Sequence, residues 1–196
     1  MAEIAPVLAQ LRAPLGVFAI LGNHDWWDDA TAQRERKGPI IAARALRDAH
    51  IPVLENDVVR IKKDDQSFWL AGLGDQIAFV RGPGRFDGVD DMPGTLAKVA
   101  DDAPVILLAH EPDIFPQVPE GVALTLSGHT HGGQVRLLGY SPMVPSQYGN
   151  RYAYGHVIED GRHLIVSGGL GTSILPVRFG VPPEVVLIEL GAGAVA

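Results

Sequence analysis

Residues 17–25 of the chain read Val17-Phe18-Ala19-Ile20-Leu21-Gly22-Asn23-His24-Asp25. A continuous apolar run that ends in a polar turn is typical of a buried strand, which delivers the polar residues at its carboxyl end. Two later runs end in the same way, residues 105–109 before His110 and residues 122–126 before His129 and His131. In open α/β folds, ligands gather beyond the carboxyl ends of the strands. We therefore expect the three turns to meet at one place.

The apolar runs along the rest of the chain predict an α/β fold. We expect a helix over residues 31–49, a long loop over residues 74–94 and a short helix over residues 95–100. The predicted strands are residues 52–54, 58–61, 68–73, 105–109, 122–126, 151–158, 163–167 and 184–190, with a hairpin between the second and third. Because the strands are short and the helices few, the pattern favours a sheet sandwich with helices outside it. One domain over residues 1–196 is expected.

Composition and charge exclude several classes of protein. The 196 residues include 16 Lys and Arg against 23 Asp and Glu, a formal charge of −7, which argues against a nucleic-acid-binding surface. The chain has no Cys, so disulfide scaffolds and thiolate metal sites are excluded. No apolar stretch reaches the roughly 18 residues of a membrane span, and residues 1–12 lack the pattern of a signal peptide. We therefore expect a cytoplasmic protein without a transmembrane segment.

The histidines gather in the three polar turns. Four of the seven lie there, namely His24, His110, His129 and His131. A single His after a strand is more often a hydrogen-bonding residue, but four of them mixed with Asn and Asp favour a metal site. Imidazole nitrogen together with the Asn23 oxygen suits Mn, Fe, Zn or Mg better than Cu. His50 and His163 are interpreted as structural residues, and the role of His156 stays open.

These motifs resemble those of the calcineurin-like metallophosphoesterase family. The matching residues are, in order, Gly22-Asn23-His24-Asp25, Ala109-His110 and Gly128-His129-Thr130-His131. The resemblance is nearest to the bacterial membrane-associated phosphodiesterases that are similar to UDP-2,3-diacylglucosamine pyrophosphohydrolases, and it covers nearly the whole chain. It implies an αββα sandwich and the metal-dependent hydrolysis of a phosphoester, most readily a phosphodiester.

The resemblance also implies a role for each motif residue. Asn23, His110 and His129 would bind one divalent metal ion, and His131 a second. Two such ions bind the phosphate oxygens and activate a water molecule for attack on phosphorus. His24, held by Asp25, would be the catalytic residue that protonates or stabilises the leaving oxygen, because a carboxylate fixes the tautomer of the imidazole.

The sequence departs from the family pattern before residue 17. The motifs Asp-x-His and Gly-Asp-x-x-Asp, which supply three further metal ligands in the family, have no counterpart there, so we expect an N-terminally truncated fold. Three explanations stay open: a shortened form of a longer enzyme, a form that recruits Asp28, Asp75, Asp113 or a second subunit, and a non-catalytic protein that binds one metal ion or none. Asp75 and Glu111 are otherwise interpreted as turn residues. Because missing strands would expose an edge or an apolar face, we expect a homo-oligomer.

Two further residues are candidates for substrate contact. Trp26, followed by Trp27, comes directly after the first turn and either lines a substrate pocket or forms an apolar lid. Arg151 is a candidate for binding a phosphate or a sugar. Residues 137–144 are apolar and are predicted to be buried, with contact to a membrane surface as the alternative.

Overall fold

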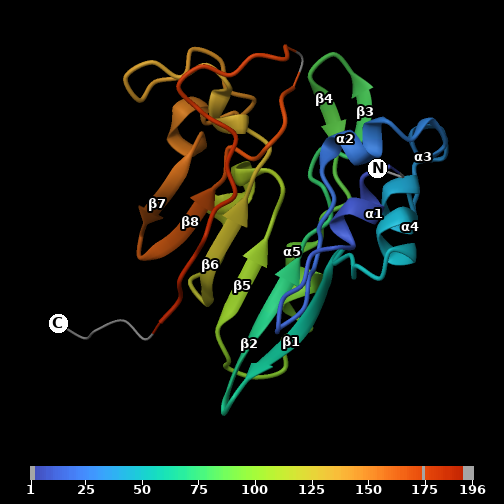
Figure 1. The fold of residues 1–196 in the computed structure, drawn as a ribbon, viewed down its shortest axis with the longest axis vertical. Coiled ribbons are helices and arrows are strands. Elements are labelled where there is room, and N and C mark those ends of the chain that lie inside the picture. The colour runs from blue at the N-terminus through green and yellow to red at the C-terminus, as the bar shows by residue number, and fades with distance from the viewer. Residues whose placement is uncertain (1–2, 174, 192–196) are drawn as a thin grey trace.

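The computed structural model of the chain describes residues 3–173 and 175–191 (Figure 1). The α-helices are α1 (Ala5–Leu8), α2 (Asn23–Trp27), α3 (Ala30–Glu35), α4 (Ile41–Asp48) and α5 (Met92–Leu96). Three 3-10 helices are η1 (Pro112–Gln117), η2 (His131–Gly133) and η3 (Gly149–Tyr152). The strands are β1 (Asp57–Lys63), β2 (Gln66–Gly72), β3 (Phe79–Gly82), β4 (Arg85–Asp87), β5 (Val105–Leu108), β6 (Val122–Ser127), β7 (Gly155–Glu159) and β8 (Arg162–Val166). Among the described helices, none has both the length and the apolar character that a bilayer crossing requires.

Six of the strands form one mixed sheet in the order β1-β2-β5-β6-β8-β7. The inner strands β2, β5, β6 and β8 run parallel, and β1 and β7 pair antiparallel at the two edges (Figure 1). β3 and β4 form a separate hairpin beside α2. The predicted α/β class is therefore confirmed, with a mixed sheet flanked by helices. Its parallel centre brings the carboxyl ends of β5 and β6 to the same edge.

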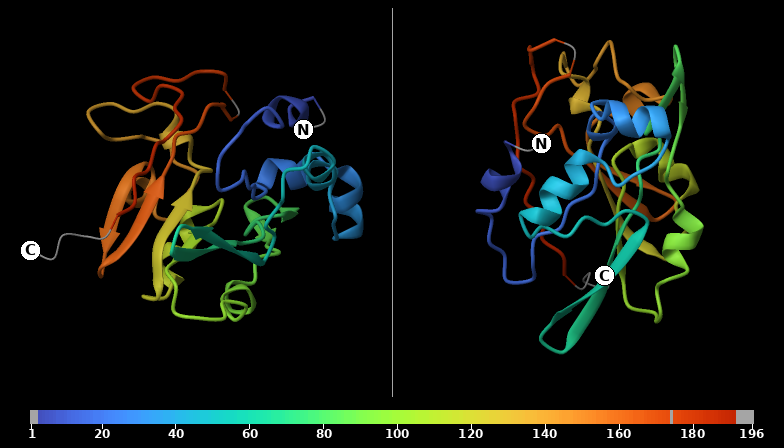
Figure 2. Two further views of the ribbon diagram at one scale, coloured as in Figure 1. Left: turned by 60° about the horizontal axis from the view of Figure 1, so that its bottom comes forward. Right: turned by 90° about the vertical axis from the view of Figure 1, so that its right-hand side faces the viewer.

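The core has two parts. One lies where α5 and η1 pack against the sheet, and it buries Leu107, Phe115 and Leu164. The other joins α2, α3 and α4 to β3. Figure 2 shows helices α1 to α4 gathered on one side of the molecule. Leu54 packs closely on β2 at Gly72. A Cβ atom on residue 72 would come within 2.4 Å of the Cβ of Leu54, so only glycine fits there.

The predicted strand over residues 17–21 is reduced to a single bridge. Ala19 pairs with Val53 in parallel, the Ala19 N–H donates to Pro52 at 2.9 Å and the Leu54 N–H donates to Ala19 at 2.8 Å. The predicted strand over residues 52–54 is the other half of that bridge. Within the described residues this pairing is not extended by a third segment, which explains why neither run forms a longer strand.

The predicted helix over residues 31–49 is two helices. α3 ends at Glu35 and α4 begins at Ile41, with Gly38-Pro39 between them. Pro39 has no backbone N–H to donate, and glycine is the poorest helix former after proline, so the pair interrupts the helix. The predicted loop over residues 74–94 contains the β3–β4 hairpin and the start of α5.

The predictions for the last strands are partly wrong. The segment 151–158 begins as η3, and only from Gly155 does it pair as β7. Residues 184–190 form no strand, although their apolar pattern predicts one. The Glu184 N–H donates to Gly169 at 3.0 Å, but the side chains of Val185 and Leu187 are 84% and 85% exposed. A strand needs a neighbouring strand to pair with, and the described residues offer none to this segment.

Candidate metal centre

The three polar turns lie side by side because the sheet ladder continues past the strand ends. The Ala109 N–H donates to Leu126 and the Gly128 N–H donates to His110, each at 3.0 Å. These bonds hold the turn after β5 against the turn after β6. Asn23 is the first residue of α2, where the chain leaves the apolar run that precedes it.

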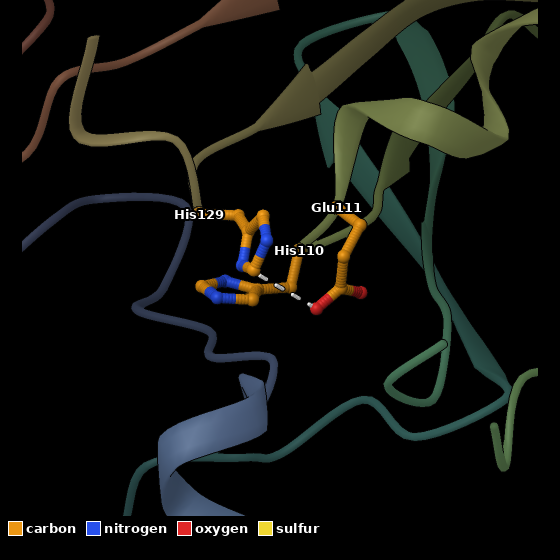
Figure 3. A group of neighbouring side chains, drawn as sticks. All are labelled: His110, Glu111 and His129. Atoms are coloured by element: carbon orange, nitrogen blue, oxygen red, sulfur yellow. Dashed lines mark ion pairs between the residues drawn. The ribbon is translucent and has the colours of Figure 1, made fainter. Parts of the chain in front are cut away.

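Asn23, His110 and His129 meet at this place. The Asn23 Oδ1 lies 3.1 Å from His110 Nε2 and 3.2 Å from His129 Nδ1. The two imidazole rings stand nearly edge to face, with centroids 5.2 Å apart. Figure 3 shows His110 and His129 turned toward each other from their two turns, with Glu111 beside them. The side chain of Asn23 is buried, so the cluster is shielded from solvent on that side.

The spacing of these atoms suits one divalent cation. Two atoms bound at right angles to one ion, each at about 2.1 Å, lie about 3 Å apart. The separations of 3.1 and 3.2 Å around Asn23 Oδ1 match that distance. His110 Nε2, His129 Nδ1 and a carboxylate oxygen of Glu111 also lie within 4.8 Å of one another. The residues present therefore fit a metal ion with mixed nitrogen and oxygen ligands.

The electrostatics keep the two imidazoles neutral. Burial, together with the neighbouring imidazoles of His129, His131 and His24, lowers the pKa of His110 to about 3. Burial also lowers the pKa of His129. A neutral imidazole offers a free lone pair, which is the form that binds a metal ion. The site is therefore ready to accept a cation at neutral pH.

His131 lies outside this cluster. Its Nδ1 is 3.2 Å from the carbonyl oxygen of Gly171 and 3.4 Å from Nη2 of Arg178. His129 and His131 both have left-handed backbones, with φ of 63° and 51°. Non-glycine residues in this region cost about 1–3 kcal/mol each and are held by their surroundings. Here the Thr130 hydroxyl donates to Ala153 at 2.7 Å and holds the turn that both histidines share.

Curated proteins align with the chain along nearly all of its length. The uncharacterized metallophosphoesterase YkuE of Bacillus subtilis is 33% identical over 189 residues, which cover 95% of this chain and 60% of that protein. An uncharacterized metallophosphoesterase of Aquifex aeolicus is 33% identical over 187 residues, covering 95% and 65%. The phosphodiesterase YaeI of Escherichia coli is 33% identical over 186 residues, covering 94% and 62%.

The chain is therefore similar, over nearly all of its length, to proteins that are named metallophosphoesterases or phosphodiesterases. It spans between 60% and 65% of the length of these three relatives. No family model matches the sequence, and no solved structure is significantly similar to it. Similarity to metallophosphoesterases implies divalent metal ions as cofactors, and the cluster of Asn23, His110 and His129 is a place that fits one.

His24 and Asp25 lie beside the cluster of Asn23, His110 and His129 without a hydrogen bond to each other. His24 is exposed in the first turn of α2, and its ring centroid is 5.3 Å from that of Trp27. The Asp25 carboxylate accepts a hydrogen bond from the Gly22 N–H at 3.0 Å. Among the described residues, no hydrogen bond joins His24 to Asp25. Burial raises the pKa of Asp25 above its ordinary value, although the bond from Gly22 opposes this.

The two residues predicted to contact substrate, Trp26 and Arg151, make contacts with other parts of the protein. Trp26 is 2% exposed and packs edge to face on Phe79, so its side chain belongs to the core. The Arg151 guanidinium donates to both carboxylate oxygens of Glu159 at 2.8 Å. Trp27 is the tryptophan that lies next to His24. The sequence places two tryptophans after the first turn, but it does not indicate which of their side chains faces the site.

Glu111 is the site residue that the sequence interpretation missed. It is not a cap of its local turn, because its Oε2 accepts a hydrogen bond from the Gln76 N–H at 3.2 Å, 35 residues away. Its Oε1 lies 3.7 Å from His129 Nδ1 (Figure 3). Burial raises the pKa of Glu111 and of Asp75, and the nearness of Asp75 raises that of Glu111 further. Its position directly after His110 was the only signal in the sequence.

Proposed function

We propose that the chain takes part in the metal-dependent hydrolysis of a phosphoester, most readily a phosphodiester. The observation that carries the proposal is the convergence of Asn23 Oδ1, His110 Nε2 and His129 Nδ1 from three separate turns. The choice of a diester is supported by the printed name of the Escherichia coli relative, which is a phosphodiesterase. Substrate identity beyond the phosphoester bond does not follow from residues that act on the phosphate.

In this proposal, Asn23, His110 and His129 hold one divalent cation, and His131 belongs to the position of a second. Mn, Fe, Zn and Mg suit this mixture of ligands. A divalent ion in such a site supplies Lewis-acid polarisation of a phosphoryl oxygen and activates water at neutral pH. The neutral state of the two buried imidazoles leaves their nitrogens available to it.

In this proposal, His24 transfers a proton to the leaving oxygen. Histidine exchanges protons near neutral pH, and His24 is exposed directly after the proposed ligand Asn23. Asp25 has a positioning role, because its carboxylate accepts a hydrogen bond from the Gly22 N–H at the start of α2. It therefore keeps α2, and with it Asn23 and His24, in place.

The test uses bis(p-nitrophenyl) phosphate with added Mn²⁺. We expect turnover by the wild-type chain, loss of both turnover and bound metal in Asn23→Ala, and loss of turnover with metal retained in His24→Ala. His50→Ala is the matched control, because this histidine is exposed after α4 and lies outside the proposed site. Turnover that survives in Asn23→Ala at the wild-type rate would refute the proposal.

A second candidate function is metal binding without catalysis in a self-associating protein. It is favoured by the apolar side chains that the C-terminal segment presents, with Val185, Leu187 and Leu190 between 64% and 85% exposed. Metal bound by the wild-type chain, together with no turnover of any diester or monoester tested, would favour this alternative over hydrolysis.

A further inference from the structure

Glu111 turns a buried, unsatisfied oxygen toward the metal cluster. The residue is 3% exposed, and its Oε1 has no hydrogen-bond partner among the described residues. The same oxygen lies 3.7 Å from His129 Nδ1 (Figure 3). A buried polar atom without a partner costs free energy, and a bound ion is one kind of partner that removes this cost.

The direction of this oxygen is set by two hydrogen bonds with one residue. The Gln76 N–H donates to Glu111 Oε2 at 3.2 Å, and the Gln76 side-chain amide donates to the carbonyl oxygen of Glu111 at 2.9 Å. Gln76 follows β2, and Glu111 follows the neighbouring strand β5. Since one carboxylate oxygen is held by the loop after β2, the other is left facing His129.

Among the described residues of the cluster, Glu111 is the one that can carry a negative charge. Asn23, His110 and His129 are neutral ligands, and a divalent cation in a buried site is stabilised by an anionic one. Two other carboxylates near the turns, those of Asp113 and Asp25, accept hydrogen bonds elsewhere. Asp113 accepts hydrogen bonds from the Ser146 hydroxyl at 2.5 Å and the Gln147 N–H at 2.9 Å, and Asp25 accepts from Gly22.

We propose that Glu111 is the anionic ligand of the cation held by Asn23, His110 and His129, through its Oε1. This inference rests on the proposed function and adds a residue that the family motifs of the sequence do not assign. The ion that it selects is a divalent one that accepts carboxylate oxygen and imidazole nitrogen together, such as Mn²⁺, Fe²⁺, Co²⁺ or Zn²⁺.

The test measures Co²⁺ binding by calorimetry and by the visible absorption of the bound ion. The protein carries His163→Ala throughout, because His156 Nε2 and His163 Nδ1 lie 2.9 Å apart on the surface and could chelate Co²⁺ themselves. In this background we expect Glu111→Gln to raise the Kd for Co²⁺ at least about tenfold and to change the absorption spectrum. Glutamine keeps an oxygen that can accept from the Gln76 N–H, so the loop contact survives.

Two further variants separate a ligand from a residue that only positions the loop. Glu111→Asp keeps the charge but withdraws it by one methylene group, and we expect it to weaken Co²⁺ binding as well. Glu55→Gln changes a half-buried carboxyl that lies outside the cluster, and we expect wild-type affinity and spectrum. Thermal unfolding checks that all three are folded.

The outcomes divide clearly. Wild-type affinity and spectrum in Glu111→Gln, with binding lost in Asn23→Ala, would overturn the role of Glu111 and leave the proposed function standing. An equal loss of affinity in Glu55→Gln and Glu111→Gln, with an unchanged spectrum, would also overturn it in favour of a general effect of negative charge. No saturable Co²⁺ binding by the unsubstituted site would overturn this inference together with the proposed function.

Discussion

Gly22 lies directly against the imidazole of His110. A Cβ atom on residue 22 would come within 2.7 Å of both Nε2 and Cε1 of that ring, closer than carbon atoms approach in proteins. Glycine at this position therefore lets the backbone before α2 pass beside a proposed metal ligand. The proposed sharing of one cation by the two turns requires this close approach.

We expect Gly22→Ala to displace the His110 ring and to raise the Kd for Mn²⁺ at least about tenfold, in a protein that still folds. Gly128→Ala is the matched control, because a Cβ atom there would meet His110 at an ordinary 4.0 Å. Calorimetric titration with Mn²⁺ compares the two. Equal affinity in both variants would show that the ring of His110 moves aside without loss.

Asp29 joins the starts of two helices. Its Oδ1 accepts hydrogen bonds from the Thr31 and Ala32 N–H groups at 3.1 and 3.0 Å, and its Oδ2 accepts from the Ile41 N–H at 2.8 Å. Asp29→Ala leaves all three donors without this partner, so we expect the free energy of unfolding to fall by about 1–3 kcal/mol at pH 7. Urea denaturation measures the change, with Asp28→Ala, an exposed neighbour, as the control.

The same carboxylate gives a pH dependence. Its backbone hydrogen bonds, with those from Ala32 and Ile41 foremost, lower the pKa of Asp29 below its ordinary value of 3.8. A lowered pKa stabilises the folded state at pH values above 3.8, and the contribution is lost as the pH falls through the folded-state pKa. The difference between wild type and Asp29→Ala should therefore shrink below that pH. A difference that stays constant down to the acid transition would contradict this assignment.

The sequence predicts the meeting of the turns better than it predicts the elements around them. Apolar runs ending at His110 and His129 indicate parallel strands, and neighbouring parallel strands end at one edge of a sheet. The contact of Glu111 with Gln76 depends on which strands become neighbours, so a local sequence pattern cannot predict it. The segment 184–190 has the pattern of a strand but lacks a partner, and pairing is a property of two segments.

Trp27 forms an aromatic wall next to His24. Its ring stacks on Phe86 with centroids 5.3 Å apart and an angle of 14° between the planes. An aryl group leaving from phosphorus beside His24 would contact this wall. We expect Trp27→Ala to raise the KM for bis(p-nitrophenyl) phosphate roughly twofold to tenfold, because an aromatic contact contributes about 0.5–1.5 kcal/mol.

Trp27→Phe is the matched variant for this effect. It keeps an aromatic ring but loses the hydrogen bond that the Trp27 indole N–H donates to the carbonyl oxygen of Ile77 at 2.9 Å. We expect its KM to stay near that of the wild type. If Trp27→Phe and Trp27→Ala raise KM equally, the residue acts by holding the loop at Ile77 and not by contacting the substrate.

Self-association is expected through the C-terminal segment. Val185 and Leu187 are 84% and 85% exposed while Val186 between them is 39% exposed, so alternate side chains face away from the sheet as in an unpaired strand. An exposed apolar segment of this kind can pair with another chain.

We expect an oligomer by light scattering at micromolar concentration and a smaller species for Leu187→Asp. Val177→Asp, the same kind of change at a residue 53% exposed outside the segment, should leave the mass unchanged. A monodisperse monomer of the wild-type chain would refute this prediction, and an equal effect of both substitutions would assign the association to general surface apolarity.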